Sequence, residues 1–296
     1  MFPLQEYQTA LKSAERGLWV SGTHGTVTQA IWLPRPGSLI VACLDGTLLQ
    51  LTPNVLEDST LNAVPEAKAT SSAKVPAKEA AKKPTFSKTV YRHTEAVKHL
   101  KWLENPDGAP YLVSATESGL VAVFDTAGGK FQTLQAPKRL SFAPCSALST
   151  SASTIAASFE NGTTQLFDAH FNVTFNITPN HAEPMTTSLD QNGHLLAMGL
   201  LDEVAFIYDT RNTSEAVHKM TTQGAVRAIK LHPTKANLCV TASDDGHVRV
   251  WDLSTSCPVC SYDFKHADKA TTLSWSEESQ EEFVSGSFDG LLLRHK

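Results

Sequence analysis

Short apolar runs separated by turn residues recur along most of this chain, and the clearest set consists of residues 226–231, 238–242 and 247–252. The second and third runs are joined through Asp245 and Gly246. An Asp-Gly pair between two apolar runs favours a tight hairpin, because glycine adopts positive φ without steric cost. The third run alternates between polar and apolar positions, as a half-buried strand does. The pattern therefore predicts three consecutive antiparallel strands.

Weaker copies of the same pattern recur elsewhere in the chain. When they are aligned on the turn, five further copies lie at residues 41–51, 113–125, 156–168, 197–209 and 284–295. The turn positions 119, 162, 203, 246 and 290 are separated by 43, 41, 43 and 44 residues, and a period of about 40 to 45 is typical of four-stranded propeller blades. A single three-stranded unit is marginal in water, so the copies must pack against one another. We therefore expect an all-β fold.

An aromatic residue followed by aspartate closes four of the copies. These pairs are Phe124-Asp125, Phe167-Asp168, Tyr208-Asp209 and Trp251-Asp252. They resemble the degenerate Trp-Asp ending of the WD40-repeat family, and the resemblance covers about residues 18–51 and 86–296. It implies a WD40-type β-propeller, which we expect to form one domain over residues 1–296.

The number of blades depends on how residues 52–85 are interpreted. This segment is rich in Ala, Lys and Pro and has no aromatic residue, so we predict a disordered insertion in the first blade. It serves either as a solvated spacer or as a basic tether for an acidic partner. The remaining chain favours six blades, although seven, the usual number in the family, stays possible. The resemblance implies that a strand at residues 17–21 closes the ring by completing the last blade, and a ring left open for a partner is the alternative.

Composition and charge limit the cellular setting. The net charge of −5 is mild, so no overall electrostatic attraction to nucleic acid is indicated. No apolar run approaches the roughly 18 residues that a membrane span needs, and the five cysteines are scattered, as suits a reducing compartment. We expect a protein of the cytoplasm, the nucleus or both.

The resemblance also implies buried hydrogen-bonded sets of His, Ser or Thr, Asp and Trp within single blades. The matching residues are Ser243, Asp245 and Trp251 in one blade, His266, Ser287 and Asp289 in the last, and His93 and Thr116 in the second. No blade has the complete set. We interpret these residues as structural, because catalytic Ser-His-Asp sets need an accessible nucleophile and an oxyanion hole. Cys257 and Cys260 have C-x-x-C spacing but lack the second pair that a zinc site needs, so we predict no metal, cofactor or catalytic residue.

The loops that precede the first strands should gather on the face that carries the hairpin turns. They contain the candidate interaction residues Glu95, Lys138, Arg139, Glu183, Gln223, Arg227, Asp268 and Lys269. Charges of both signs suit a protein or peptide better than a polyanion. The sequence therefore favours a non-catalytic scaffold subunit of a multiprotein complex. The alternatives are a peptide or cargo receptor that uses this face and, least favoured, an enzyme. A small-molecule substrate is not indicated.

Overall fold

The structure, a computed structural model, is composed of antiparallel strands. It describes residues 27–32, 39–51, 89–104, 110–126, 130–134, 143–151, 154–178, 182–255, 257–276 and 281–296. Within these ranges all regular elements are strands, and no helix is long and apolar enough to cross a membrane. The predicted insertion at 52–85 and the predicted closing strand at 17–21 lie outside the described residues.

The strands form six separate sheets, and in each sheet the strands are hydrogen-bonded in chain order. The first three sheets contain β1 (Val27–Trp32), β2 (Leu39–Cys43), β3 (Thr47–Leu51) and β4 (Thr89–Arg92); β5 (Val97–Leu103), β6 (Tyr111–Thr116), β7 (Val121–Asp125) and β8 (Phe131–Leu134); and β9 (Cys145–Ser151), β10 (Thr154–Phe159), β11 (Thr164–Phe167) and β12 (Val173–Ile177).

The last three sheets follow the same plan, except that the sixth has three described strands. They contain β13 (Pro184–Leu189), β14 (Leu195–Leu200), β15 (Val204–Asp209) and β16 (His218–Thr221); β17 (Val226–Leu231), β18 (Leu238–Ser243), β19 (His247–Asp252) and β20 (Val259–Lys265); and β21 (Ala270–Trp275), β22 (Phe283–Ser287) and β23 (Leu292–His295). The predictions of an all-β fold and of six repeated sheets are therefore confirmed.

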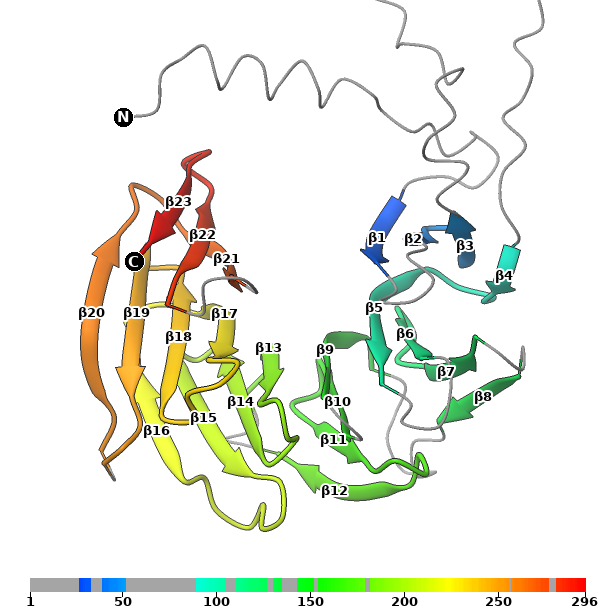
Figure 1. The fold of residues 1–296 in the computed structure, drawn as a ribbon, viewed down its shortest axis with the longest axis horizontal. Helices are drawn as coiled ribbons and strands as arrows, with labels where there is room; N and C mark the ends of the chain where they lie inside the picture. Colours follow the sequence, from blue (N-terminus) through cyan, green and yellow to red (C-terminus); the bar gives the residue numbers. More distant parts are fainter. Residues whose placement is uncertain are drawn as a thin grey trace, which may run out of the picture.

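The six sheets are arranged around a common centre, as Figure 1 shows, with the first strand of each sheet innermost. The innermost strands contact one another in the order β1, β5, β9, β13, β17 and β21. Among the described strands no comparable contact joins β21 back to β1, and the arc in Figure 1 is open between these two sheets. Because residues 17–21 are not described, the predicted ring closure stays a prediction.

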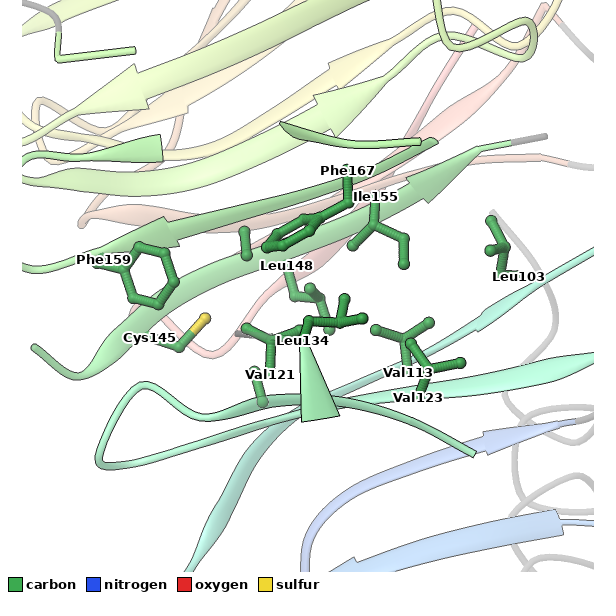
Figure 2. Packing of buried hydrophobic residues seen from close by; sticks show 12 residues of the cluster. Leu103, Val113, Val121, Val123, Leu134, Cys145, Leu148, Ile155, Phe159 and Phe167 are labelled. Atoms are coloured by element: carbon green, nitrogen blue, oxygen red, sulfur yellow. The ribbon is translucent and has the colours of Figure 1, made fainter. Parts of the chain in front are cut away.

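The core lies between successive sheets rather than within one of them. Figure 2 shows the boundary between the second and third sheets, where Val113 and Val121 face Cys145, Leu148 and Phe159. All five side chains are buried. Each strand directs alternate residues to opposite faces, and a sheet between two others is covered on both faces. This explains the nearly continuous apolar runs of the second strands.

An extra residue is inserted near the start of the first strand in all six sheets. In β17 the register shifts between Val226 and Ala228, so that Arg227 has no partner on β18. Such a bulge re-aims the side chain of the extra residue and ends regular pairing. The corresponding residues are Thr28, Lys98, Ser146, Met185, Arg227 and Thr271. Bulge residues are thereby repeated around the centre of the molecule.

Candidate interaction face

The bulge residues and the hairpin turns meet at one end of the sheets. The backbone N–H of the first turn residue donates to a carbonyl just ahead of the first strand, as from Glu117 to Ala96 and from Asp244 to Ala225. We call the six bulge residues and the six first turn residues together the turn-face ring. The first turn residues are Leu44, Glu117, Glu160, Leu201, Asp244 and Phe288.

Charged members of the turn-face ring are paired with one another. The Arg227 guanidinium donates to both carboxylate oxygens of Asp244, at 2.8 and 2.7 Å, and this contact lowers the pKa of Asp244. Lys269 Nζ lies 3.6 Å from the same carboxylate. These fixed pairs hold the loops in place and leave little net charge between the fifth and sixth sheets.

Apolar members of the ring are exposed. Leu44, Leu201 and Phe288 occupy equivalent turn positions in the first, fourth and sixth sheets, and their exposed fractions are 54%, 46% and 70%. Large apolar side chains gain free energy when they are removed from water. Three of the six first turn residues on this face therefore expose a large apolar side chain.

A cavity opens on this face between the first and second sheets. Its volume is about 590 Å³, and it is lined by Leu44, Glu95, Ala96, Glu117 and Ser118. Two of the five lining residues are carboxylates, and one of them, Glu117, lies 3.6 Å from Lys98 Nζ. The cavity therefore combines an apolar side chain with an acidic rim.

The structure places most of the predicted interaction residues on this face. Glu95 lines the cavity, and the Glu183 carbonyl accepts from Leu201 N–H. Gln223 N–H donates to the Asp245 carboxylate at 3.2 Å, so the backbone of this residue is bonded to the hairpin turn. The remaining predicted residues are Arg227 and Lys269, which bind Asp244; Asp268, which accepts from Lys269 N–H; and Lys138 and Arg139, which lie outside the described residues.

A continuous chain of polar side chains runs through the sixth sheet and ends at Tyr262 of β20, and its central members His266, Ser285 and His295 are buried. His266 Nδ1 lies 3.1 Å from the Asp289 carboxylate, and its Nε2 lies 2.8 Å from Ser285 Oγ. Ser285 Oγ is also 2.7 Å from His295 Nε2, and His295 Nδ1 is 3.0 Å from Tyr262 Oη. The chain joins the turn face to the opposite end of the sheet.

This chain corrects one predicted residue. Ser285 takes the place that the sequence assigned to Ser287, which instead donates to the Asp268 carbonyl. The two serines lie on the same face of β22 because side chains repeat every two residues. Ser285, in the middle of the strand, lies between the His266 and His295 side chains.

The same displacement by two residues occurs in two other sheets. His93 Nε2 lies 3.0 Å from Ser114 Oγ, whereas Thr116 bonds Ser118. Trp251 Nε1–H donates to Thr241 Oγ1 at 2.9 Å. In each case the hydrogen bond is made by the hydroxyl residue in the middle of the strand, and not by the predicted residue at the strand end.

The fifth sheet has no histidine beside Asp245, and an arginine takes that place. Arg249 Nη2 lies 2.9 Å from the Asp245 carboxylate, and both side chains are largely buried. Burial alone would raise the pKa of Asp245, but hydrogen bonds from Ser243, His247 N–H and Arg249 lower it. The sequence offered no signal for this role, because Arg249 occupies one of the polar positions of the alternating strand.

The geometry argues against chemistry at these sites. Ser285 is 0% exposed and is held between two imidazoles, so no substrate carbonyl can reach its hydroxyl. Burial lowers the pKa of His93 to about 4 and raises the pKa of the Cys145 thiol to about 12. Cys257 and Cys260 are free and exposed. Within the described ranges no three His, Cys, Asp or Glu side chains are grouped to hold a metal ion.

Comparisons with known proteins agree with this architecture. The family model described as "WD domain, G-beta repeat" matches residues 214–252, which span β16 to β19. Gem-associated protein 5 of Homo sapiens and of Mus musculus is 39% identical over 61 residues. That match is 21% of this chain and only 4% of the length of either relative.

Two solved structures resemble the whole arc. A chain from a crystal structure of the mitotic checkpoint complex has a TM-score of 0.67 at 18% identity, covering 94% of this chain and 82% of that chain. The computationally designed Ika8 protein has a TM-score of 0.66 at 17% identity, covering 91% of this chain and 70% of that chain. Identities this low support the fold alone. A WD repeat is therefore matched at residues 214–252, and the six sheets of one build have the architecture of a WD40-type β-propeller.

Proposed function

We propose that this chain is a non-catalytic scaffold that binds other proteins through the turn-face ring as a subunit of a multiprotein complex. The observation that carries the proposal is the repetition of exposed Leu44, Leu201 and Phe288 at equivalent turns. Apolar anchors surrounded by a polar rim are the usual build of protein–protein contact surfaces. Residues 1–296 act in this proposal as one propeller domain, in the cytoplasm or the nucleus.

A matched pair of substitutions tests the proposal. Leu201 and Val217 are 46% and 49% exposed, but Leu201 belongs to the turn-face ring whereas Val217 lies at the opposite end of the same sheet. Tagged full-length variants Leu201→Asp and Val217→Asp would be purified from the cells that express the protein. Mass spectrometry would then compare their associated proteins with those of the wild type.

The proposal expects stoichiometric partners to be lost from Leu201→Asp and kept by Val217→Asp, with equal melting temperatures for the two variants. Phe288→Asp should repeat the loss from another sheet. If both turn-face variants keep every partner, the turn-face ring is not the interface.

A second candidate function is a receptor for a short basic peptide segment. It is favoured by the cavity of about 590 Å³ with Glu95 and Glu117 in its lining, because cationic side chains would be complementary to these carboxylates. A fluorescently labelled peptide library with one or two Lys or Arg residues would be screened by polarisation. Glu95→Lys should abolish binding, and Glu215→Lys, an exposed carboxylate at the other end of the fourth sheet, should not.

A further inference from the structure

A cavity separates the fifth and sixth sheets at the end opposite the hairpin turns. Its volume is about 200 Å³, and its lining includes Leu238, Val250, Tyr262, Trp275 and Phe283. Leu238 and Phe283 begin the second strands of the two sheets, whereas the turns follow the ends of those strands. The Trp275 ring lies 5.1 Å from the Phe283 ring, measured between centroids. The interior of the cavity is therefore apolar and largely aromatic.

The lysines and the glutamate that line the cavity are already paired. Lys235 Nζ lies 3.6 Å from the Glu281 carboxylate, and Lys296 Nζ lies 3.2 Å from the Glu282 carboxylate. A charged ligand group would have to leave water without a new partner, which is unfavourable. The cavity therefore suits an uncharged apolar group.

The equivalent place between the second and third sheets is filled by an aromatic side chain. Tyr111 begins β6 as Leu238 begins β18, and the Phe171 ring lies 5.3 Å from the Tyr111 ring in an edge contact. Phe171 follows β11 of the third sheet and packs against the core cluster of that boundary. Its φ of 64° is unfavourable for a residue with a Cβ. The protein keeps this strained backbone where the ring fills the boundary.

The boundary between the fourth and fifth sheets is filled in a similar way. Leu253 follows β19 of the fifth sheet and is 7% exposed, and Leu195, which begins β14, packs against the same cluster. At both boundaries the filling side chain comes from just beyond the third strand of the later sheet. Between the fifth and sixth sheets no described side chain takes this place, and the cavity lies there.

The third strand of the sixth sheet also has an unpaired edge. In each of the first five sheets the third strand pairs with a fourth, whereas among the described strands β23 pairs only with β22. In the third sheet, Val173 of the fourth strand lies opposite Phe167, and Phe171 stands two positions ahead of Val173. Phe167 and His295 each follow their turn glycine by five residues. A segment paired with β23 in the same register would direct a residue two positions ahead of the one opposite His295 to the cavity.

We propose that β23 and this cavity bind an extended, uncharged segment of a partner protein, which adds a fourth strand and inserts an aromatic side chain between the fifth and sixth sheets. In such strand addition, main-chain hydrogen bonds supply affinity and the side-chain pocket supplies specificity. The site lies at the opposite end of the sheets from the turn-face ring, so it does not depend on the proposed scaffold surface.

The predicted strand at residues 17–21 fits this cavity poorly. It has the same length as β12 at residues 173–177, so in the same register the residue that corresponds to Phe171 is Glu15. A carboxylate is unfavourable in an apolar cavity whose charged residues are already paired. A partner segment with an aromatic residue at that position is the better match.

Fluorescence polarisation with the purified full-length protein tests the site. The probe is a peptide with the sequence of residues 171–177, Phe-Asn-Val-Thr-Phe-Asn-Ile, labelled at its C-terminus, since this segment takes the equivalent place in the third sheet. It should bind saturably. A peptide with alanine in place of the first phenylalanine should bind at least about tenfold more weakly, because it leaves the cavity unfilled.

A matched pair of variants on β20 locates the binding. Tyr262→Asp puts a carboxylate into the lining and should weaken binding at least about tenfold. Val259→Asp changes a residue of the same strand that is 57% exposed and outside the lining, so it should bind as the wild type does. Melting temperatures would verify that both variants fold. The peptide should also change the intrinsic tryptophan fluorescence, and Trp275→Phe should remove that change while polarisation still detects binding.

Several results would overturn the proposal. These are no saturable binding, equal binding of the alanine peptide, or equal weakening by Tyr262→Asp and Val259→Asp. Binding that requires the double substitution Trp19→Pro and Val20→Pro, which prevents residues 17–21 from pairing as a strand, would show that the chain's own segment occupies β23. Dimerisation in light scattering that Tyr262→Asp abolishes would identify a second copy as the occupant instead.

Discussion

The fifth and sixth sheets have the same strand order and period, but they differ in what covers them. The fifth has four strands and is enclosed between two sheets, whereas the sixth has three described strands and, among the described residues, a neighbouring sheet on one face only. The contrast is clearest two residues after the turn, at Val248 in the fifth sheet and Leu292 in the sixth. Val248 is 0% exposed and Leu292 is 72% exposed.

The difference extends over the whole outer face of the sixth sheet. Ala228 and Val250, which face the sixth sheet from the fifth, correspond by register to Thr272 and Arg294. At these two positions the face that no described sheet covers carries polar residues, whereas Leu292 on the same face is apolar and exposed. Position in the arc, and not only membership of a repeat, therefore governs residue choice.

The largest expected effect is at the end of the third strand. Trp251 in the fifth sheet is buried with Ile229 and Leu231 and donates to Thr241, so Trp251→Ala should lower the free energy of unfolding by about 3 to 5 kcal/mol. His295, the corresponding residue of the sixth sheet, should cost less on replacement by alanine. Chemical denaturation of both variants measures the difference, and equal losses would show that the two sheets are equally enclosed.

The next effect is at the position two residues after the turn. Val248→Ala should cost about 2 kcal/mol, the free energy of burying a valine side chain. Leu292→Ala should change stability by less than about 0.5 kcal/mol, as is usual at exposed positions. Denaturation midpoints would show both. A large loss for Leu292→Ala would mean that residues outside the described ranges cover this face.

A smaller effect is expected at the turn glycines. Gly246 and Gly290 both have positive φ, at 82° and 79°, so alanine at either costs about 1 kcal/mol in backbone strain. A Cβ at Gly246 would also lie 3.0 Å from the carbonyl oxygens of His266 and Asp268, whereas none lies within 4 Å at Gly290. Gly246→Ala should therefore have the lower melting temperature of the two, and the reverse order would contradict the packing described here.

The smallest effect is a pH dependence of the sixth sheet. Burial, and then the charge of His266, lower the pKa of His295 below its ordinary value of 6.5. The unfolded chain therefore binds a proton first as the pH falls, and stability is lost below about pH 6.5. Hydrogen exchange at pH 5.5 and 7.5 should show faster opening of β22 and β23 than of β18 and β19 at the lower pH. His295→Gln should reduce that difference because it removes the titrating imidazole. The difference should not vanish, since the hydrogen-bonded chain keeps the titratable groups His266, Asp289 and Tyr262.

The sequence predicted the sheets well because turn chemistry and strand alternation are local. Asp245 and Gly246 mark a hairpin whatever surrounds them, and a spacing of 43 or 44 residues recurs only if each copy is one structural unit. The last sheet has three described strands, and its completion by residues 17–21 stays a prediction. The side of the molecule on which Glu95, Arg227 and Lys269 lie was also predictable, because the meander sets it, whereas their role in an interaction stays a prediction.

What the sequence left open was decided by packing between sheets. Ser285 and Ser287 lie on the same face of β22. Only the position of the His266 side chain determines that Ser285, and not Ser287, is its hydrogen-bond partner. Arg249 lies beside the Asp245 carboxylate because of its position on β19. Local pattern specifies which side of a strand a residue faces, whereas the arrangement of neighbouring sheets determines what that residue meets.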